Sequence, residues 1–299
     1  MAGPKSVQQR GRIRNLASLI SRSLLLKMGF GLLISLIVLA ALQPLITKMI
    51  IGDKSPLAIG NFEKYLPSSF EHPLGTDQFG RDLLVTLLIG LRFSWYIGVI
   101  AGLFSTFVAI TMATVSGYLG GKVDVLLNGI TNAVLVIPAL PVLIAIASYV
   151  RMDLTSMAAI LAAFAWPFPT RLIRAQILSL KERNYINLAK MSGLGNFEIM
   201  FTEILPNLTP FIGVGFASSI TAAMGAEVGF RLLGLGPGDL PSLGLMIQWA
   251  QQYGALSHAH YNILVAPALT LVMIFIALIL INTGLEETFN PRLKKITGL

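Results

Sequence analysis

Residues 263–281 read ILVAPALTLVMIFIALILI, a stretch that contains no charged residue and a single hydroxyl, at Thr270. A helix needs about 20 consecutive apolar residues to cross the hydrocarbon core of a bilayer. This stretch is long enough and apolar enough to do so. It therefore predicts a membrane-spanning helix near the C-terminal end of the chain.

The composition of the whole chain agrees with a membrane protein. Hydrophobic residues make up 55% and charged residues 12% of the 299 residues, whereas a soluble domain carries about 25% charged residues. A soluble fold of this length could not bury so much apolar surface and keep a solvated exterior. The sequence has no cysteine, which excludes disulfides, thiolate metal sites and cysteine nucleophiles.

Outward from residues 263–281, the hydrophobic pattern predicts six membrane-spanning helices in all. The other five cover approximately residues 28–46, 95–118, 125–150, 154–172 and 208–230. The basic segment before Met28 is typical of a signal peptide, but the apolar run is too long and no small-residue cleavage site closes it. We therefore expect an uncleaved first helix at 28–51, preceded by a basic tail at 1–27.

The distribution of Lys and Arg predicts the orientation of the chain. Fifteen of the 22 share one side, with six before Met28, one in the 119–124 hairpin, five in residues 171–206 and three in the tail at 286–299. Positive residues accumulate on the cytoplasmic side of a membrane. Both termini and the 171–206 segment are therefore expected in the cytoplasm, and the loops predicted at 52–94 and 231–260 are expected outside.

The polar segment at residues 178–207 is too charged to cross the membrane. Its apolar residues fall at helical spacing in two sets, which Gly193 and Gly195 separate. The sets are Tyr185, Leu188, Ala189 and Met191, and then Phe197, Met200, Phe201, Ile204 and Leu205. We predict two short amphipathic helices joined by a glycine turn, the second of which ends at Pro206. Such an element suits a groove on another protein, although a re-entrant or surface-lying connector fits the pattern equally well.

This segment resembles the EAA loop of permease subunits in ATP-binding-cassette importers. The family pattern is Glu-Ala-Ala, three residues, a glycine, and about nine residues before a hydrophobic-x-Leu-Pro ending. The matching positions here are Asn187, Leu188, Ala189, Gly193, Leu205 and Pro206. The first two of these positions depart from the pattern, and Glu203 occupies the hydrophobic slot. The glycine turn and the helical ending are retained.

Three further segments resemble the dipeptide/oligopeptide group of these permeases, in the order that the group has them. Residues 71–82 resemble its HPLGTDxxGRD segment, residues 118–124 its GYxGGxxD hairpin and residues 233–244 its LGLG…PSWG loop. The first segment supplies Gly75, Thr76, Asp77, Gly80, Arg81 and Asp82, and Arg92 follows it. Leu243 stands where the group has tryptophan, and Glu227 matches a glutamate often seen before the loop.

The resemblance implies an all-α, polytopic membrane protein with a type I importer (MetI-like) permease core at residues 95–285. Such a permease forms half of a pathway for di- or oligopeptides, or for small oligosaccharides such as cellobiose. A second homologous permease subunit and an extracytoplasmic substrate-binding protein are the implied partners in the cell membrane of a prokaryote. Two partner ATPase subunits would bind the ATP and Mg, so this chain is expected to bind no cofactor and no nucleic acid and to catalyse no reaction.

The fifth predicted helix carries an ionisable residue that allows two interpretations. Glu227 either lines the pathway or pairs with Arg231 one helical turn further on. The fourth and fifth helices are also rich in small residues. Small residues permit close helix packing and can equally leave room for a pathway.

Two groups in the predicted external loops could carry chemistry. His258 and His260 alternate as metal ligands can, but no acidic or cysteine partner is near them in the sequence, which favours solvated loop residues. Asp77, Arg81 and Asp82 contain the residue types of a catalytic cluster. Their place in the loop favours helix-capping and salt-bridge roles instead.

Other classes of protein agree less well with the sequence. A self-sufficient secondary transporter needs ionisable residues at mid-membrane, and the predicted helices have almost none there. A membrane-embedded enzyme needs a carboxylate, histidine or serine constellation at the interface, and none has convincing spacing. Lys122 follows a glycine, but Ser116 and Val123 break the Walker pattern on either side, so the chain is not expected to bind ATP.

Overall fold

The computed structural model describes residues 23–150 and 152–289 as helices joined by turns and loops. Most of the predicted basic tail, Arg151 and the last ten residues lie outside the described part. The longer helices are α2 (Leu24–Ile51), α3 (Leu83–Leu119), α4 (Gly121–Val136), α5 (Ala139–Tyr149), α6 (Leu154–Ala165), α7 (Pro167–Lys181), α10 (Thr209–Leu232) and α12 (Tyr261–Phe289). Shorter elements are α8 (Asn184–Met191), α9 (Asn196–Ile199), a π-helical turn at Met200–Ile204, a 3₁₀ turn at Leu205–Leu208 and α11 (Leu243–Gln252).

Four helices of the described residues are long and apolar enough to cross a membrane, and the number is six when each of two bent pairs is counted as one span. The pair α4–α5 bends by 80° and the pair α6–α7 by 44°. Prolines explain both breaks, because Pro138 precedes α5 and Pro167 begins α7, and proline cannot donate the hydrogen bond of a helix interior. The prediction of an all-α protein with about six spans is confirmed.

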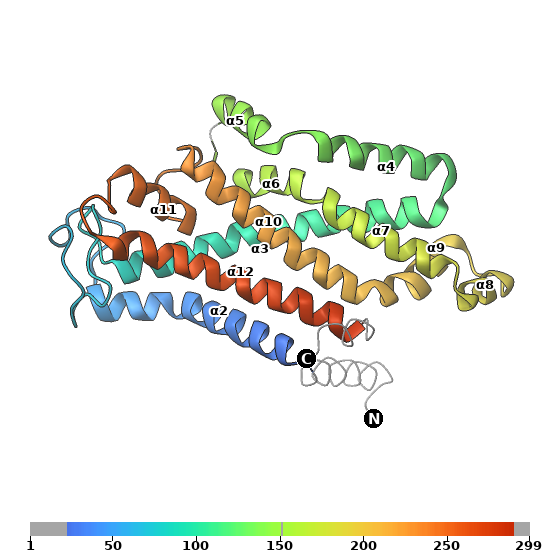
Figure 1. Cartoon of the computed structure of the whole chain (residues 1–299), viewed down its shortest axis with the longest axis horizontal. Coiled ribbons are helices and arrows are strands. Elements are labelled where there is room, and N and C mark those ends of the chain that lie inside the picture. Colours follow the sequence, from blue (N-terminus) through green and yellow to red (C-terminus); the bar gives the residue numbers. More distant parts are fainter. Residues whose placement is uncertain (1–22, 151, 290–299) are drawn as a thin grey trace.

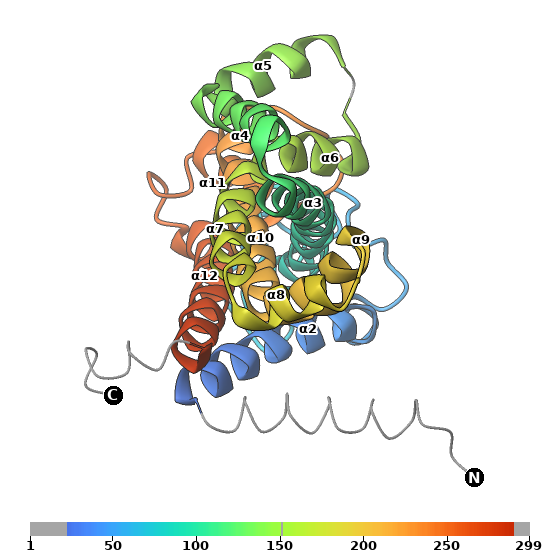
Figure 2. The same cartoon turned by 90° about the vertical axis from the view of Figure 1, so that its right-hand side faces the viewer.

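The helices run between two ends of an elongated bundle (Figure 1). One end carries α8 and α9, and the other carries α11 and the loop between α2 and α3. In the view along the bundle, α3 and α10 lie centrally, α2 lies on one side, and α4 and α5 lie on the other (Figure 2). Half of the spanning window of α3 is buried, against 17% for α2, so α3 is the central packing element.

Local signals explain where α3 begins and ends. Asp82 caps its start by accepting a hydrogen bond from the backbone N–H of Val85 at 2.9 Å. Gly120 ends it with a φ of +69°, and α4 begins at the next residue. The predicted hairpin is therefore a turn of one residue, in a conformation that glycine adopts without steric cost.

Three predicted boundaries were wrong. The second span begins at Leu83 instead of residue 95, because the Asp82 cap starts the helix early and Arg92 does not interrupt it. The predicted 231–260 loop contains α11, which Ser242 caps through the backbone N–H of Leu245.

The third wrong boundary is at Pro206, which does not end a helix. The π-helical and 3₁₀ turns carry the chain past Pro206 into α10, so that Asn196–Leu232 is one continuous helical rod. In this local geometry the N–H of Leu205 bonds to the Met200 carbonyl oxygen. Proline at the start of the 3₁₀ turn needs no donor there.

Candidate functional site

The segment between α7 and α10 folds as two short helices around a left-handed glycine. Gly193 has a φ of +80°. The N–H of Leu194 bonds to the carbonyl oxygen of Ala189, and the N–H of Gly193 to that of Lys190. This pair of bonds is a Schellman ending. The predicted glycine turn between helices is confirmed, with α8 on one side and α9 on the other.

One face of this segment is anchored to the bundle. Ile186 of α8 and Ile199 of α9 are fully buried, and they pack in one cluster with Ile173 and Ile177 of α7. The hydroxyl of Tyr118, at the end of α3, donates a hydrogen bond to the Asn196 side-chain oxygen at 3.2 Å. The segment is thus packed against α7 and hydrogen-bonded to the end of α3.

The opposite face is apolar and exposed at the end of the molecule. The exposed fractions of Leu188, Met191, Phe197 and Phe201 are 63%, 84%, 75% and 64%. These four belong to the apolar sets that defined the segment in the sequence. Other members of the same sets, Ala189, Met200 and Ile204, are buried with Ile186 against the bundle.

The polar residues of the EAA-like positions are also accessible. Asn187, in place of the family glutamate, is exposed, whereas Ala189 is buried against the bundle. Burial raises the pKa of Tyr185, and the nearby carboxylate of Glu203 raises it further while Arg183 lowers it. Tyr185 therefore stays neutral at physiological pH and adds a neutral polar group beside the exposed Arg183 at the start of α8.

The far end of the same helical rod carries a buried ion pair. Arg231 Nε donates to Glu227 Oε1 at 3.0 Å, and Arg231 Nη1 donates to the carbonyl oxygen of Pro237. Ser242 Oγ donates to the same Glu227 oxygen at 2.5 Å. The exposed fractions of Glu227 and Arg231 are 2% and 1%. Glu227 thus pairs with Arg231, which was one of its two predicted roles. A role in the pathway stays a prediction.

These contacts hold three elements together. Ser242 is the first residue of the turn into α11, and the next backbone N–H, of Leu243, donates to Ser94 Oγ of α3 at 2.9 Å. We call Glu227, Arg231, Ser242 and Ser94 the Glu227 clamp. It joins α10, α11 and α3 at the end opposite α8. Gly244 belongs to its packing, because a Cβ there would lie 2.5 Å from Glu227 Oε2.

The motif residues of the loop between α2 and α3 have structural roles. Asp77 receives two bonds from the backbone and one, at 2.7 Å, from Arg81 Nε. Asp82 caps α3, and its Oδ2 atom lies 2.8 Å from His72 Nδ1. The Arg81 guanidinium lies 4.7 Å from the Trp249 ring centroid, which ties the loop to α11. The predicted capping and salt-bridge roles are confirmed.

The glycines and the threonine of this motif serve the same loop. Gly75 and Gly80 both have positive φ, and the Thr76 hydroxyl donates to the Glu63 carbonyl oxygen at 2.6 Å. A Cβ on Gly75 would collide with the Leu66 carbonyl oxygen. The motif is therefore a folding signal for a compact loop.

We expect Gly75→Ala to lower the melting temperature of the purified protein more than Gly60→Ala does. Both glycines have a φ of +80°, so both substitutions carry the left-handed penalty of about 1–2 kcal/mol. Only Gly75 also has a backbone atom in the way, which adds about 1–3 kcal/mol of overpacking. Thermal unfolding in detergent measures the difference, and equal shifts would contradict the role of the Leu66 contact.

The two histidines of the loop after α11 do not form a metal site with their neighbours. His258 Nδ1 lies 2.9 Å from the Gly254 carbonyl oxygen, and His260 stacks on Tyr65 at 4.3 Å between ring centroids. Within residues 23–150 and 152–289, no group of three or more potential metal-ligating side chains occurs. His260 thus joins two loops instead of standing free in solvent.

Comparison with known proteins identifies the kind of molecule to which these features belong. Residues 82–295 match the profile of the binding-protein-dependent transport system inner membrane component. The chain belongs to this permease family. The match begins at the residue that caps α3 and covers every later helix.

Three named relatives indicate a group within this family. The permease is 31% identical to the oligopeptide transport system permease protein OppC of Lactococcus lactis subsp. cremoris, over 83% of this chain and 85% of the relative. It is 30% identical to the dipeptide transport system permease protein DppC of Alkalihalophilus pseudofirmus, over 89% and 85% of the two chains. It is 33% identical to OppC of Mycobacterium tuberculosis, over 75% and 77%. The resemblance to the dipeptide/oligopeptide group is confirmed.

Some residues that matter in this permease were not singled out from the sequence. Ser242 stands inside a quoted motif, but its bond to Glu227 joins residues 15 positions apart. Ser94 and Leu243 are 149 positions apart. Such pairings leave no periodic signal. Ile186 could have been found as the apolar residue that falls out of phase with Tyr185 and Leu188.

Proposed function

We propose that this permease forms one half of the pathway of an ATP-driven importer and that α8 is the element that contacts a partner ATPase. The exposed apolar face of Leu188, Met191, Phe197 and Phe201 carries this proposal. Large apolar side chains that are exposed together on a polar segment mark an interaction site. A short amphipathic helix that presents such a face suits a groove on a partner protein.

The rod Asn196–Leu232 offers a mechanical route from the ATPase to the opposite end of the permease. Its α9 end is packed with α8, and its other end holds the Glu227 clamp on α11 and α3. A tilt of the rod driven at α8 would displace the clamp as one body. We infer that ATP binding and hydrolysis on the partner subunits open and close the pathway in this way.

A second permease subunit would complete the pathway. In α4 the only buried residue is Thr131 and in α5 it is Leu143, among the described residues of those helices. The two helices therefore lie over the bundle with most of their apolar surface uncovered, at the edge shown in Figure 2. We propose that the homologous subunit packs against part of this surface and that lipid covers the remainder.

The positive residues support a cytoplasmic position for the α8 end. Fifteen of the 22 Lys and Arg in the full chain fall on that side when the six spans are followed in order. The α11 end and the loop after α2 would then face outside. There a substrate-binding protein would deliver the solute to the permease in the membrane of a prokaryotic cell.

The names of the relatives support di- or oligopeptides as the transported solutes. Small oligosaccharides such as cellobiose are the second candidate class, because solute choice in such systems rests largely with the binding protein. The permease chain itself is proposed to bind no cofactor and to catalyse no reaction. ATP and Mg²⁺ would be held by the partner ATPases.

The test is purification of the tagged chain with its partners, followed by reconstitution in liposomes. We expect a second permease and ATPase subunits to copurify, and uptake of a labelled dipeptide to require internal ATP and added binding protein. Uptake of labelled cellobiose is measured in parallel. Solute movement by this chain alone, without ATP and driven by an ion gradient, would instead establish a secondary transporter and overturn the proposal.

A further inference from the structure

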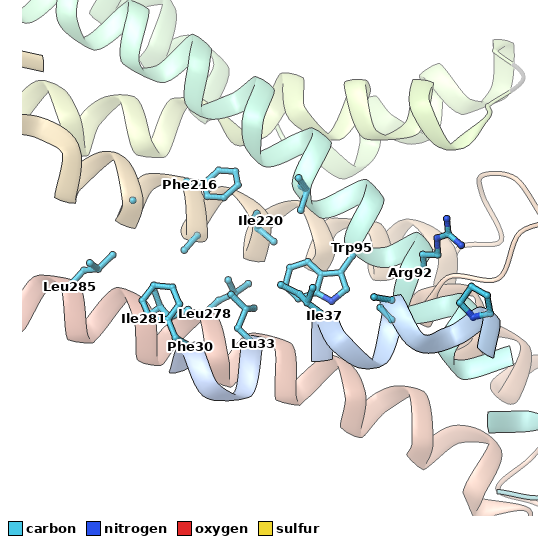
Figure 3. A pocket seen from close by; sticks show the side chains of 16 residues that line it. Phe30, Leu33, Ile37, Arg92, Trp95, Phe216, Ile220, Leu278, Ile281 and Leu285 are labelled. Carbon is cyan, nitrogen blue, oxygen red and sulfur yellow. The ribbon is translucent and has the colours of Figure 1, made fainter. Parts of the chain in front are cut away.

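An apolar groove of about 670 Å³ lies between α2 on one side and α3, α10 and α12 on the other (Figure 3). It runs along the helix axes from Leu285, past Phe216 and Ile220, to Arg92. Among the described residues that line it, the guanidinium of Arg92 and the indole N–H of Trp95 are the only polar side-chain groups. Both groups stand at the same end of the groove.

Neither of these polar groups has a partner among the described residues. The Nε1 atom of Trp95 is buried and has no hydrogen-bond acceptor. Arg92 is exposed, and it forms no ion pair or hydrogen bond in the part of the chain that the structure describes. Both groups only donate hydrogen bonds. The ligand that complements them is an acceptor, and beside a guanidinium it is an anion.

A second hollow, of about 680 Å³, meets the groove at Arg92 and Trp95. Its lining adds Gln43 of α2, Tyr96 of α3 and Thr155 of α6, which bring polar groups. A hollow that carries these polar groups therefore continues the apolar groove, and the Arg92 cation stands at the junction. This arrangement matches an amphiphile that has an anionic head and a long apolar tail.

The depth of Arg92 matches the edge of the hydrocarbon core of a bilayer. The 37 residues of α3 extend over ~55 Å at 1.5 Å per residue, whereas the hydrocarbon core is about 30 Å thick. Arg92 lies nine residues from the middle of α3, or about 14 Å along the axis. From there its long side chain can reach the headgroups, and Trp95 and Tyr96 lie about one turn deeper. The apolar groove then lies alongside the acyl chains.

We propose that this groove is a phospholipid-binding site. An acyl chain lies between α2 and the α3–α10 layer, and the anionic headgroup contacts Arg92 and the Trp95 N–H. The apolar surface of α2 is compatible with a lipid, because Leu33 and Ile37 line the groove and Met28 and Ile34 of the same helix are exposed. The orientation given under the proposed function places this headgroup in the outer leaflet. That placement rests on the proposed function, but the binding of lipid does not.

Native mass spectrometry of the purified full chain, alone or with its partners, tests the site with phosphatidylglycerol as the probe. We expect Arg92→Gln to weaken the binding of one phosphatidylglycerol about tenfold, which corresponds to one charge-assisted hydrogen bond. Lys48→Gln is the matched control, because Lys48 is an exposed cation near the same end of α2 and does not line the groove. It should bind lipid as the wild type does.

A second pair of variants tests the groove without a change of charge. Ala41→Trp places a large side chain in the groove and should also displace the lipid, whereas Leu45→Trp, at an exposed position of α2 outside the groove lining, should not. Unchanged lipid binding in Arg92→Gln and Ala41→Trp overturns the proposal. So does a loss of uptake that affects free-acid peptides and spares their C-terminal amides while lipid binding is intact, because the arginine would then bind solute.

Lipid retention and ATP-dependent uptake are separate results in this experiment. Failure of ATPases to copurify would count against the proposed function and leave the lipid measurement on the chain valid. Conversely, a fully active importer whose Arg92→Gln variant keeps its phosphatidylglycerol would retain the proposed function and lose the lipid site.

Discussion

Glu227→Leu is expected to destabilise the permease by about 3–5 kcal/mol, the usual cost of removing one partner of a buried ion pair. The substitution leaves the Arg231 guanidinium with the Pro237 carbonyl oxygen and no counter-charge. It also removes the acceptor of Ser242 Oγ at the start of α11. Thermal unfolding of the purified complex in detergent should show a clear fall in melting temperature.

Two companion variants separate charge from shape at the clamp. Glu227→Gln keeps an oxygen that accepts a hydrogen bond and should cost less. The double variant Glu227→Leu/Arg231→Met removes both charges and should recover much of the lost stability, because an apolar pair of similar volume often replaces a buried ion pair at little cost. A double variant as unstable as Glu227→Leu alone would show that the Glu227 carboxylate matters for something other than Arg231.

The sequence predicted the large elements of this fold well, because a membrane imposes one length and one composition on each span. Residues 263–281 lie within α12 and residues 28–46 within α2, as predicted. The errors occurred where a local hydrogen bond outweighs hydropathy. Asp82 starts α3 well before the apolar run, and Ser242 starts α11 inside a segment whose glycines and prolines indicated a loop.

The bend of 80° between α4 and α5 shows a different limit. Residues 125–150 contain no charged residue and are mostly apolar, so hydropathy predicts one straight span there. Pro138 marks a break, but its angle depends on what packs against each half, and most of both halves is uncovered in this chain. The angle therefore depends on packing partners that the sequence of one subunit does not specify.

Some features of the candidate site could also be predicted from the sequence, and others could not. Glycine turns, helix caps and pairs four residues apart follow from local chemistry, which is why Gly193, Asp82 and the Glu227–Arg231 pair could be predicted. Helical spacing finds an apolar face but does not say which partner covers it. Leu188 and Met191 were found as an apolar face, and the structure shows that this face points away from the bundle.

Leu188→Asp is expected to abolish ATP-dependent uptake while it leaves the folded permease intact. Leu188 is 63% exposed in this chain, so an aspartate there remains hydrated and the melting temperature should hardly change. In the proposed complex the same position is covered by the ATPase. A carboxylate without a partner at the centre of such an interface costs about 2 kcal/mol or more, which weakens ATPase binding by about 30-fold or more.

Ile186→Ala on the opposite face of α8 is the matched control, because the two residues differ in the partner that each contacts. Ile186 is fully buried against α7 and the rod, so its truncation should cost about 2–5 kcal/mol of stability. ATPase subunits should still copurify with this variant at low temperature. If Leu188→Asp retains its ATPase subunits, α8 is not the coupling element. If Ile186→Ala loses them at a temperature where it stays folded, the buried face of α8 contributes to the contact as well.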